Sequence, residues 1–272
     1  MTKFGFLGVA VAVAAVALLA VDRPAGAETR FDGVTLRVGT WGGPWGDMQK
    51  KHIRPKLEAL GAKVTLTPKQ VTTCVDQTGI GFMFAQSFHP AMKFAGPLRP
   101  QIGIRNVFNI LGPLTNPAGA NCHVMGVANQ EIGEKLAHAL NRLGVRHAVV
   151  VNGADGLDDL TVTGESHIFE VMSGKVTERT VTPVDLGVSR HDESEIAGGT
   201  PEENAQVFRD VLAGTGSLAV RDLILVNAGA GLYVTGLASS IKIGAELAAK
   251  AIDSGDAAAR VGAFVEATRR AS

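Results

Sequence analysis

Cysteine is scarce in this sequence, and its spacing excludes the commonest roles of that residue. The 272-residue chain has two cysteines, Cys74 and Cys122. Neither lies in a Cys-x-x-Cys pair or in the Cys/His spacing of a zinc site. They could form a disulfide only if their Cα atoms lay within about 7 Å of each other. We therefore predict two buried thiols that pack as small hydrophobic side chains.

Net charge is lacking as well. The 26 basic residues balance 26 acidic ones, and the isoelectric point is about 7.1. A nucleic-acid partner would favour a basic surface, so none is predicted. Apolar residues make up 46% of the chain. At this length they can bury the core of one large domain, or of a small domain and a large one.

The N-terminus has the pattern of a secretory signal peptide. Lys3 precedes an apolar run over residues 4–21, and the small residues Ala25, Gly26 and Ala27 form a cleavage site. We predict that residues 1–27 are removed and that the protein is periplasmic or secreted where this signal is used. The alternative is a membrane anchor, because the apolar run approaches the length needed to span a bilayer.

Hydrophobic periodicity and turn residues predict alternating strands and helices. The predicted strands cover residues 34–41, 82–85, 121–127, 147–153, 168–172 and 176–181. The predicted helices cover residues 48–60, 67–77, 131–143, 200–212, 221–234, 241–252 and 257–269. Capping boxes at Thr67 and Thr200 mark two helix starts, and Ser173-Gly174 predicts a hairpin. The strand–helix–strand order favours an α/β fold with a largely parallel sheet flanked by helices.

The stretch from His89 to Pro117 places cations in a rigid, irregular loop. Its prolines remove backbone donors and fix φ, so it cannot be a regular helix or strand throughout. Fixed cations suit an anionic substrate, and the guanidinium of Arg99 could bond both oxygens of a carboxylate. Taken alone, Arg99 could equally form a surface ion pair, and His89 could be a loop histidine with satisfied hydrogen bonds.

Asp158 and Asp159 follow the apolar strand that is predicted to end at Gly153. Loops at the ends of parallel strands are where α/β proteins place ligands. Two adjacent carboxylates repel each other unless a cation lies between them, and hard oxygen ligands favour Mg²⁺. The alternative is a solvated turn.

Several pieces of the chain, in order, resemble the anthranilate phosphoribosyltransferase family over residues 57–272. The pieces are Leu57–Gly61, Gly79–Ala85, His89–Pro117, Asp155–Thr161, Asn227–Val234 and Ala251–Gly255. The resemblance implies a nucleoside-phosphorylase/phosphoribosyltransferase-type catalytic domain. It also implies transfer of phosphoribosyl from phosphoribosyl diphosphate to anthranilate, in tryptophan biosynthesis. The family is cytoplasmic and homodimeric.

The resemblance also assigns roles to residues. Arg99 would hold the anthranilate carboxylate, His89 would line the same pocket, and Asp158 and Asp159 would bind Mg²⁺. The family usually has Asp-Glu where this chain has the pair Asp158-Asp159. The family's helical N-terminal domain, which forms its dimer interface, has no counterpart here, so the homodimer is doubtful.

Residues 1–64 instead resemble the start of a periplasmic polyamine-type solute-binding protein, on the strand, Trp-Gly-Gly loop and helix of residues 34–60. We therefore predict a fusion with a signal peptide (1–27), a binding-protein-like segment (28–60) and an incomplete transferase domain (61–272). The family's Gly-Thr-Gly-Gly-Asp and Lys-His-Gly-Asn motifs are absent, which predicts impaired activity. The alternatives are an exported solute-binding module and a non-functional fusion.

Overall fold

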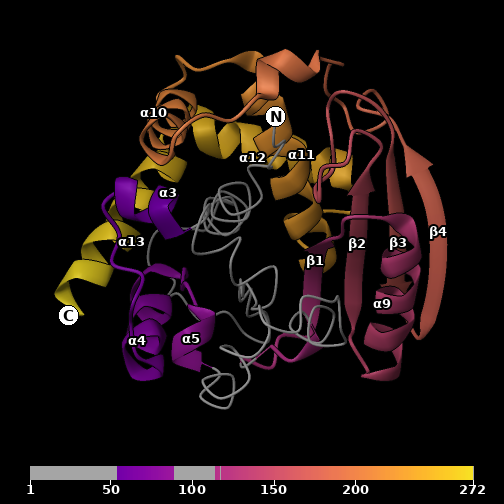
Figure 1. The fold of residues 1–272 in the computed structure, drawn as a ribbon, viewed down its shortest axis with the longest axis horizontal. Helices are drawn as coiled ribbons and strands as arrows, with labels where there is room; N and C mark the ends of the chain where they lie inside the picture. The colour runs from indigo at the N-terminus through magenta and orange to yellow at the C-terminus, as the bar shows by residue number, and fades with distance from the viewer. Residues whose placement is uncertain (1–53, 89–113, 117, 272) are drawn as a thin grey trace, which may run out of the picture. The chain divides into compact units, whose positions relative to one another are not determined.

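The computed structural model describes residues 54–88, 114–116 and 118–271 (Figure 1). The strands are β1 (Cys122–Gly126), β2 (His147–Gly153), β3 (Ser166–Met172) and β4 (Lys175–Val181). The helices are α3 (Arg54–Ala59), α4 (Pro68–Thr78), α5 (Ala85–Phe88), α9 (Gln130–Arg142), the 3-10 helix η2 (Glu193–Ile196), α10 (Pro201–Leu212), α11 (Leu218–Thr235), α12 (Ile241–Asp253) and α13 (Asp256–Arg270). The predicted signal peptide, the strand at 34–41 and the start of the helix at 48–60 lie outside the described residues.

The described residues form two compact units, and the division falls within α13. The first unit holds residues 120–261, and the second holds residues 54–119 and 262–271. The boundary that we predicted at residues 60 and 61 stays a prediction.

The sheet of the first unit is mixed, in the order β1-β2-β3-β4. β1 and β2 are parallel, whereas β2–β3 and β3–β4 are antiparallel. The predicted α/β class is confirmed, but the described part of the sheet is not largely parallel. The turn at Ser173 and Gly174, with φ angles of 53° and 76°, reverses the chain between β3 and β4. The loop that joins β2 to β3 contains no helix that would carry the chain back for a parallel crossover.

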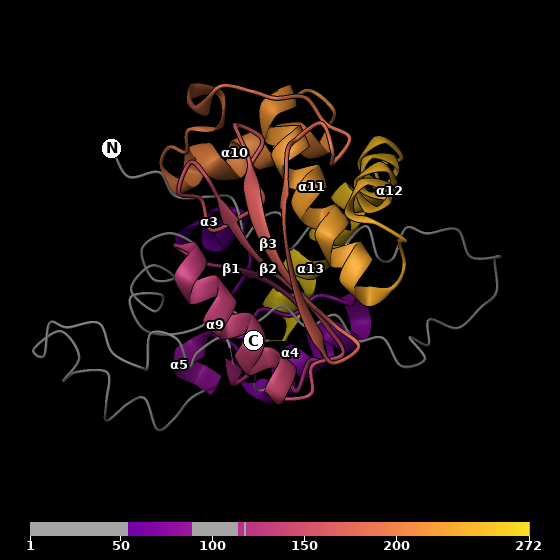
Figure 2. The ribbon, with the colours of Figure 1, turned by 90° about the vertical axis from the view of Figure 1, so that its right-hand side faces the viewer.

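Helices cover both faces of this sheet. Phe169 and Glu170 are neighbours on β3, so their side chains point to opposite faces. The Phe169 ring lies against Gly133 of α9, whereas Glu170 accepts a hydrogen bond from Tyr233 of α11. Figure 2 shows α9 and α11 on either side of the strands. Every residue of β2 is therefore buried, as its nearly continuous apolar sequence predicted.

α11 forms the centre of the first unit. It packs against β1, β2 and α12. Among the described residues it is the one helix long and apolar enough to cross a membrane, but 78% of that stretch is buried within the fold. Such burial is typical of a core helix.

Helix α4 of the second unit lies where the sequence predicted a helix. The Thr67 hydroxyl caps α4 by accepting from the Gln70 backbone, and Gly79 ends the helix with φ 72°. Cys74 is buried in the core of this unit as a free thiol. The strand predicted at residues 82–85 was wrong, because only Met83 forms a bridge and α5 starts at Ala85.

Candidate functional site

The acidic pair lies on the loop that joins β2 to β3. This loop leaves the carboxyl end of β2, which is paired in parallel with β1. Asp158 is partly exposed and Asp159 is completely buried. The pair therefore occupies the end of two parallel strands, where the sequence predicted a ligand site.

Gly126, the last residue of β1, lets this loop pass close to the strand. A Cβ built on Gly126 would lie 1.6 Å from the backbone oxygen of Asp158 and 2.6 Å from its carbonyl carbon. Backbone atoms cannot rotate away as a side chain can. The position of the acidic pair thus depends on having glycine, which has no side chain, at position 126 of the neighbouring strand.

We expect Gly126→Ala to displace the loop and to lower the free energy of unfolding by about 3 kcal/mol, because an overpacked site strains the backbone. Chemical unfolding followed by circular dichroism measures this loss. Gly164→Ala, in the same loop, is the matched control, since its Cβ would meet nothing within 4 Å. Equal stability of the two variants would contradict the close approach.

Asp155 organises the loop from within. One carboxylate oxygen accepts from the Leu157 backbone N–H at 3.1 Å. The other accepts from the hydroxyls of Thr161 at 2.5 Å and Thr163 at 2.7 Å. These bonds tie the residues before the acidic pair to those after it. Sequence reasoning missed this role, although an Asp-Gly step is a common signal of such turns.

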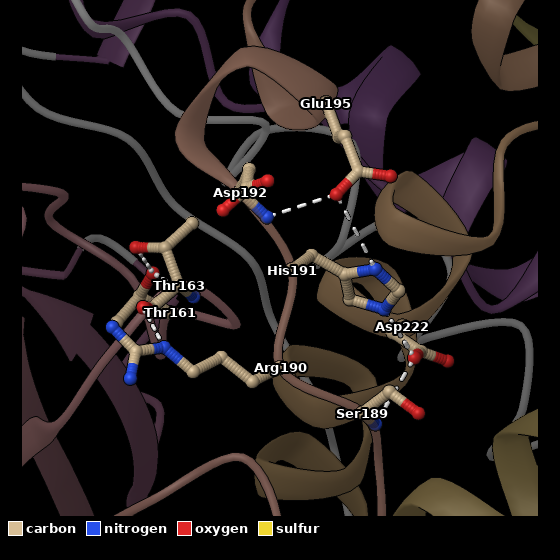
Figure 3. Close-up of polar contacts among 8 residues, drawn as sticks. All are labelled: Thr161, Thr163, Ser189, Arg190, His191, Asp192, Glu195 and Asp222. Carbon is tan, nitrogen blue, oxygen red and sulfur yellow. Dashed lines mark hydrogen bonds and ion pairs between the residues drawn. The ribbon is translucent and has the colours of Figure 1, made fainter.

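The segment of residues 189–195, which we call the strap, holds the far end of the loop (Figure 3). The Arg190 Nε donates to the Thr163 carbonyl at 2.9 Å. The His191 backbone N–H donates to the Val162 carbonyl, also at 2.9 Å. The loop that carries the acidic pair is thereby bonded to a segment about 30 residues further along the chain.

His191 fastens the strap to α11. Its Nε2 lies 2.8 Å from a carboxylate oxygen of Asp222, which also accepts from the Ser189 backbone N–H at 3.3 Å. Its Nδ1 lies 3.9 Å from a Glu195 carboxylate oxygen. Figure 3 shows the imidazole between these two acids. Spacing in the sequence could not predict this contact, because Asp222 is 31 residues away and belongs to another element.

The structure describes only the acidic half of the predicted site. Asp158 and Asp159 lie together on one loop, whereas His89 and Arg99 lie outside the described residues. The roles predicted for His89 and Arg99 therefore stay predictions.

The donor chemistry of the acidic pair fits a magnesium ion. In the described part of the chain no three His, Cys, Asp or Glu side chains converge into a ready-made metal site. Mg²⁺ does not need such a cage, because it keeps several waters and commonly uses one or two carboxylates together with substrate phosphates. Two adjacent carboxylates, one of them partly exposed, match this requirement.

Comparison with known proteins shows which family the chain belongs to. A family model described as "Glycosyl transferase family, a/b domain" matches residues 54–258. The chain belongs to this glycosyl transferase family. The match includes the described sheet, the loop with Asp158 and Asp159, the strap and α11. The resemblance predicted from the sequence is thereby confirmed at the level of the family.

Curated relatives in this family are anthranilate phosphoribosyltransferases. That of Rubrobacter xylanophilus is 47% identical over 214 residues, which are 79% of this chain and 63% of the relative. That of Methanosarcina acetivorans is 49% identical over 199 residues, which are 73% of this chain and 53% of the relative. The chain thus spans less than two thirds of the length of these relatives.

Solved structures of anthranilate phosphoribosyltransferases from other organisms share the fold of this chain. The anthranilate phosphoribosyltransferase of Thermus thermophilus superposes with a TM-score of 0.78 at 35% identity, covering 96% of this chain and 72% of that one. The Saccharomyces cerevisiae enzyme in complex with PRPP and Mg has a TM-score of 0.79 at 22% identity. The superposition covers 99% of this chain and 70% of that one. The latter likeness shows the fold alone.

The comparisons give no support to the solute-binding segment predicted for residues 1–64. The family match begins at residue 54, and residues 1–53 lie outside the described part of the chain. The fusion and the signal peptide therefore stay predictions.

Proposed function

We propose that the chain carries the metal-binding and acceptor parts of an anthranilate phosphoribosyltransferase. In this reaction the anthranilate amine attacks the ribose C1 of phosphoribosyl diphosphate. The bond between C1 and the diphosphate oxygen breaks, diphosphate leaves, and the amine nitrogen releases one proton. The observation that carries this proposal is the position of Asp158 and Asp159. They lie at the carboxyl end of the parallel strands β1 and β2, within the stretch that matches the family.

Each residue has one part in this proposal. Asp158 and Asp159 would hold Mg²⁺, which offsets the charge of the leaving diphosphate. Arg99 would orient the acceptor through the anthranilate carboxylate, and His89 would line its pocket. Reactions of this kind are accelerated by positioning and by charge stabilisation, with little covalent chemistry by the protein.

We also propose that transfer is impaired. The sequence as printed has no Gly-Thr-Gly-Gly-Asp or Lys-His-Gly-Asn motif to bind the donor. Backbone amides in such glycine-rich loops are the groups that bind phosphate oxygens. We propose no homodimer for this chain, because the family forms its dimer interface with a helical N-terminal domain that residues 1–272 do not resemble. Export depends on use of the signal peptide predicted at residues 1–27.

Anthranilate consumption with phosphoribosyl diphosphate and Mg²⁺ tests both statements. We expect a rate at least about 100-fold below that of a full-length relative, because the loss of even one charge-stabilising donor costs that much. A rate equal to the relative's would contradict the impairment. No consumption above a protein-free control would contradict the transferase proposal itself.

A further inference from the structure

Asn227 is a polar side chain in the middle of the apolar helix α11. It is only 2% exposed, and an unsatisfied amide there would cost about 1–3 kcal/mol. Its Oδ1 accepts from the Leu160 backbone N–H at 3.0 Å. Its Nδ2 donates to the Leu160 carbonyl and to the Leu223 carbonyl, each at 2.9 Å. The carboxamide therefore clamps both backbone polar groups of one residue on the β2–β3 loop.

Leu160 directly follows the acidic pair. Its N–H belongs to the peptide group that joins it to Asp159, and its carbonyl belongs to the next peptide group, which joins it to Thr161. The two bonds from Asn227 thus fix the orientation of both peptide planes. They set the direction in which the chain leaves Asp159, and hence the direction of the carboxylates.

The identity of the side chain is decisive, because the clamp needs an acceptor and a donor on one short, planar group. An aspartate has nothing to donate to the Leu160 carbonyl, and a leucine offers neither group. We propose that Asn227 is a positioning residue for the metal-binding carboxylates of Asp158 and Asp159. This inference rests on the metal role in the proposed function, and it adds to it the group that orients the site from the helix.

The chain offers a matched control in Asn204 of α10. This asparagine is 3% exposed, and it makes the same two bonds to a single residue. Its Oδ1 accepts from the Gly199 backbone N–H at 3.1 Å, and its Nδ2 donates to the Gly199 carbonyl at 2.8 Å. Gly199 precedes α10 and does not adjoin the acidic pair in the chain, so the loss of the Asn204 bonds changes stability without changing the residue next to the pair.

The experiment compares Asn227→Asp with Asn204→Asp in the full chain. Mn²⁺ replaces Mg²⁺ as a paramagnetic probe, and free Mn²⁺ is measured with phosphoribosyl diphosphate against the same mixture without protein, because the diphosphate binds Mn²⁺ itself. We expect Asn227→Asp to weaken Mn²⁺ binding about 10- to 100-fold, the usual effect of removing a group that orients metal ligands. Both variants are expected to lower the melting temperature, and Asn204→Asp to leave the Mn²⁺ affinity unchanged. Amide hydrogen exchange of Leu160, with no metal present, should quicken in Asn227→Ser, whose shorter side chain removes the acceptor of the Leu160 N–H, and should not change in Asn204→Asp.

Unchanged Mn²⁺ affinity in Asn227→Asp, at a melting temperature reduced as in Asn204→Asp, would overturn the inference. Asn227→Ser, with the same expectation, replaces the aspartate variant if that variant does not melt cooperatively. Absence of Mn²⁺ binding by the wild-type protein would instead reject the metal role in the proposed function, and this inference with it.

Discussion

Replacing Gly229 by alanine is expected to destabilise the first unit by about 3 kcal/mol, and replacing it by leucine to destabilise it further. Gly229 of α11 faces Gly244 of α12, and the two helices touch backbone to backbone. A Cβ on Gly229 would lie 2.5 Å from the Ile241 carbonyl oxygen and 2.6 Å from the Ala245 nitrogen. These atoms belong to helix α12 and to its start, so α12 as a whole must move away.

Whether Gly229→Ala raises or lowers the free energy of unfolding shows whether packing or helix propensity dominates at this position. Alanine in place of glycine inside a helix normally stabilises it by about 1 kcal/mol. Gly262→Ala in α13 is the control, because its Cβ would meet nothing within 4 Å. We expect this variant to be slightly more stable than wild type in chemical unfolding. A gain in stability in Gly229→Ala as well would show that α11 and α12 are not in close contact.

Replacing Glu170 by alanine is expected to cost about 3 kcal/mol, because it removes the shared partner of a buried polar network. The Glu170 carboxylate lies 2.8 Å from the His147 Nε2, 2.6 Å from the Tyr233 hydroxyl and 3.3 Å from the Arg179 Nη2. The variant leaves the histidine and the tyrosine without this acceptor. Glu131→Ala, which removes an exposed pair with Lys135, should leave the melting temperature nearly unchanged.

The same network predicts a dependence on pH. Burial raises the pKa of Glu170, but the hydrogen bonds from His147 and Tyr233 and the charge of Arg179 outweigh it, so the pKa lies below its ordinary 4.5. The stabilisation is therefore complete above pH 4.5 and is lost as the pH falls through the lower pKa of the folded state. Wild type should lose stability more steeply below pH 4.5 than Glu170→Gln. Parallel pH profiles of unfolding would contradict this assignment.

Local signals in the sequence located the helix ends well. The capping boxes at Thr67 and Thr200 formed as predicted, because all of their bonds lie within four residues. The hairpin at Ser173-Gly174 formed for the same reason. The Tyr233 hydroxyl donates to Glu170, which is 63 residues away, so no local spacing predicts this bond.

In the candidate site, too, local features could be predicted from the sequence and long-range contacts could not. Asp158 and Asp159 could be predicted, because they follow an apolar strand and match a family motif. Asp155 holds the loop through bonds to residues two to eight positions away, and its Asp-Gly step is a local signal of such a turn. The more distant groups that hold the loop could not be predicted, because only the fold brings them to it. Asn227 and Leu160 are 67 residues apart, and Arg190 and Thr163 are 27 apart. Hydrophobic periodicity and short motifs cannot predict hydrogen bonds between residues so far apart in the sequence.

The most direct test of the account is anthranilate consumption by wild type and by Asp158→Asn, at equal Mg²⁺ and phosphoribosyl diphosphate. Asp158 is partly exposed, so the variant should melt at the wild-type temperature. We predict slow consumption by wild type, and a loss of about 100-fold in the variant that excess Mg²⁺ partly restores. Equal rates for the two proteins would contradict the assignment of this loop as the metal site of phosphoribosyl transfer.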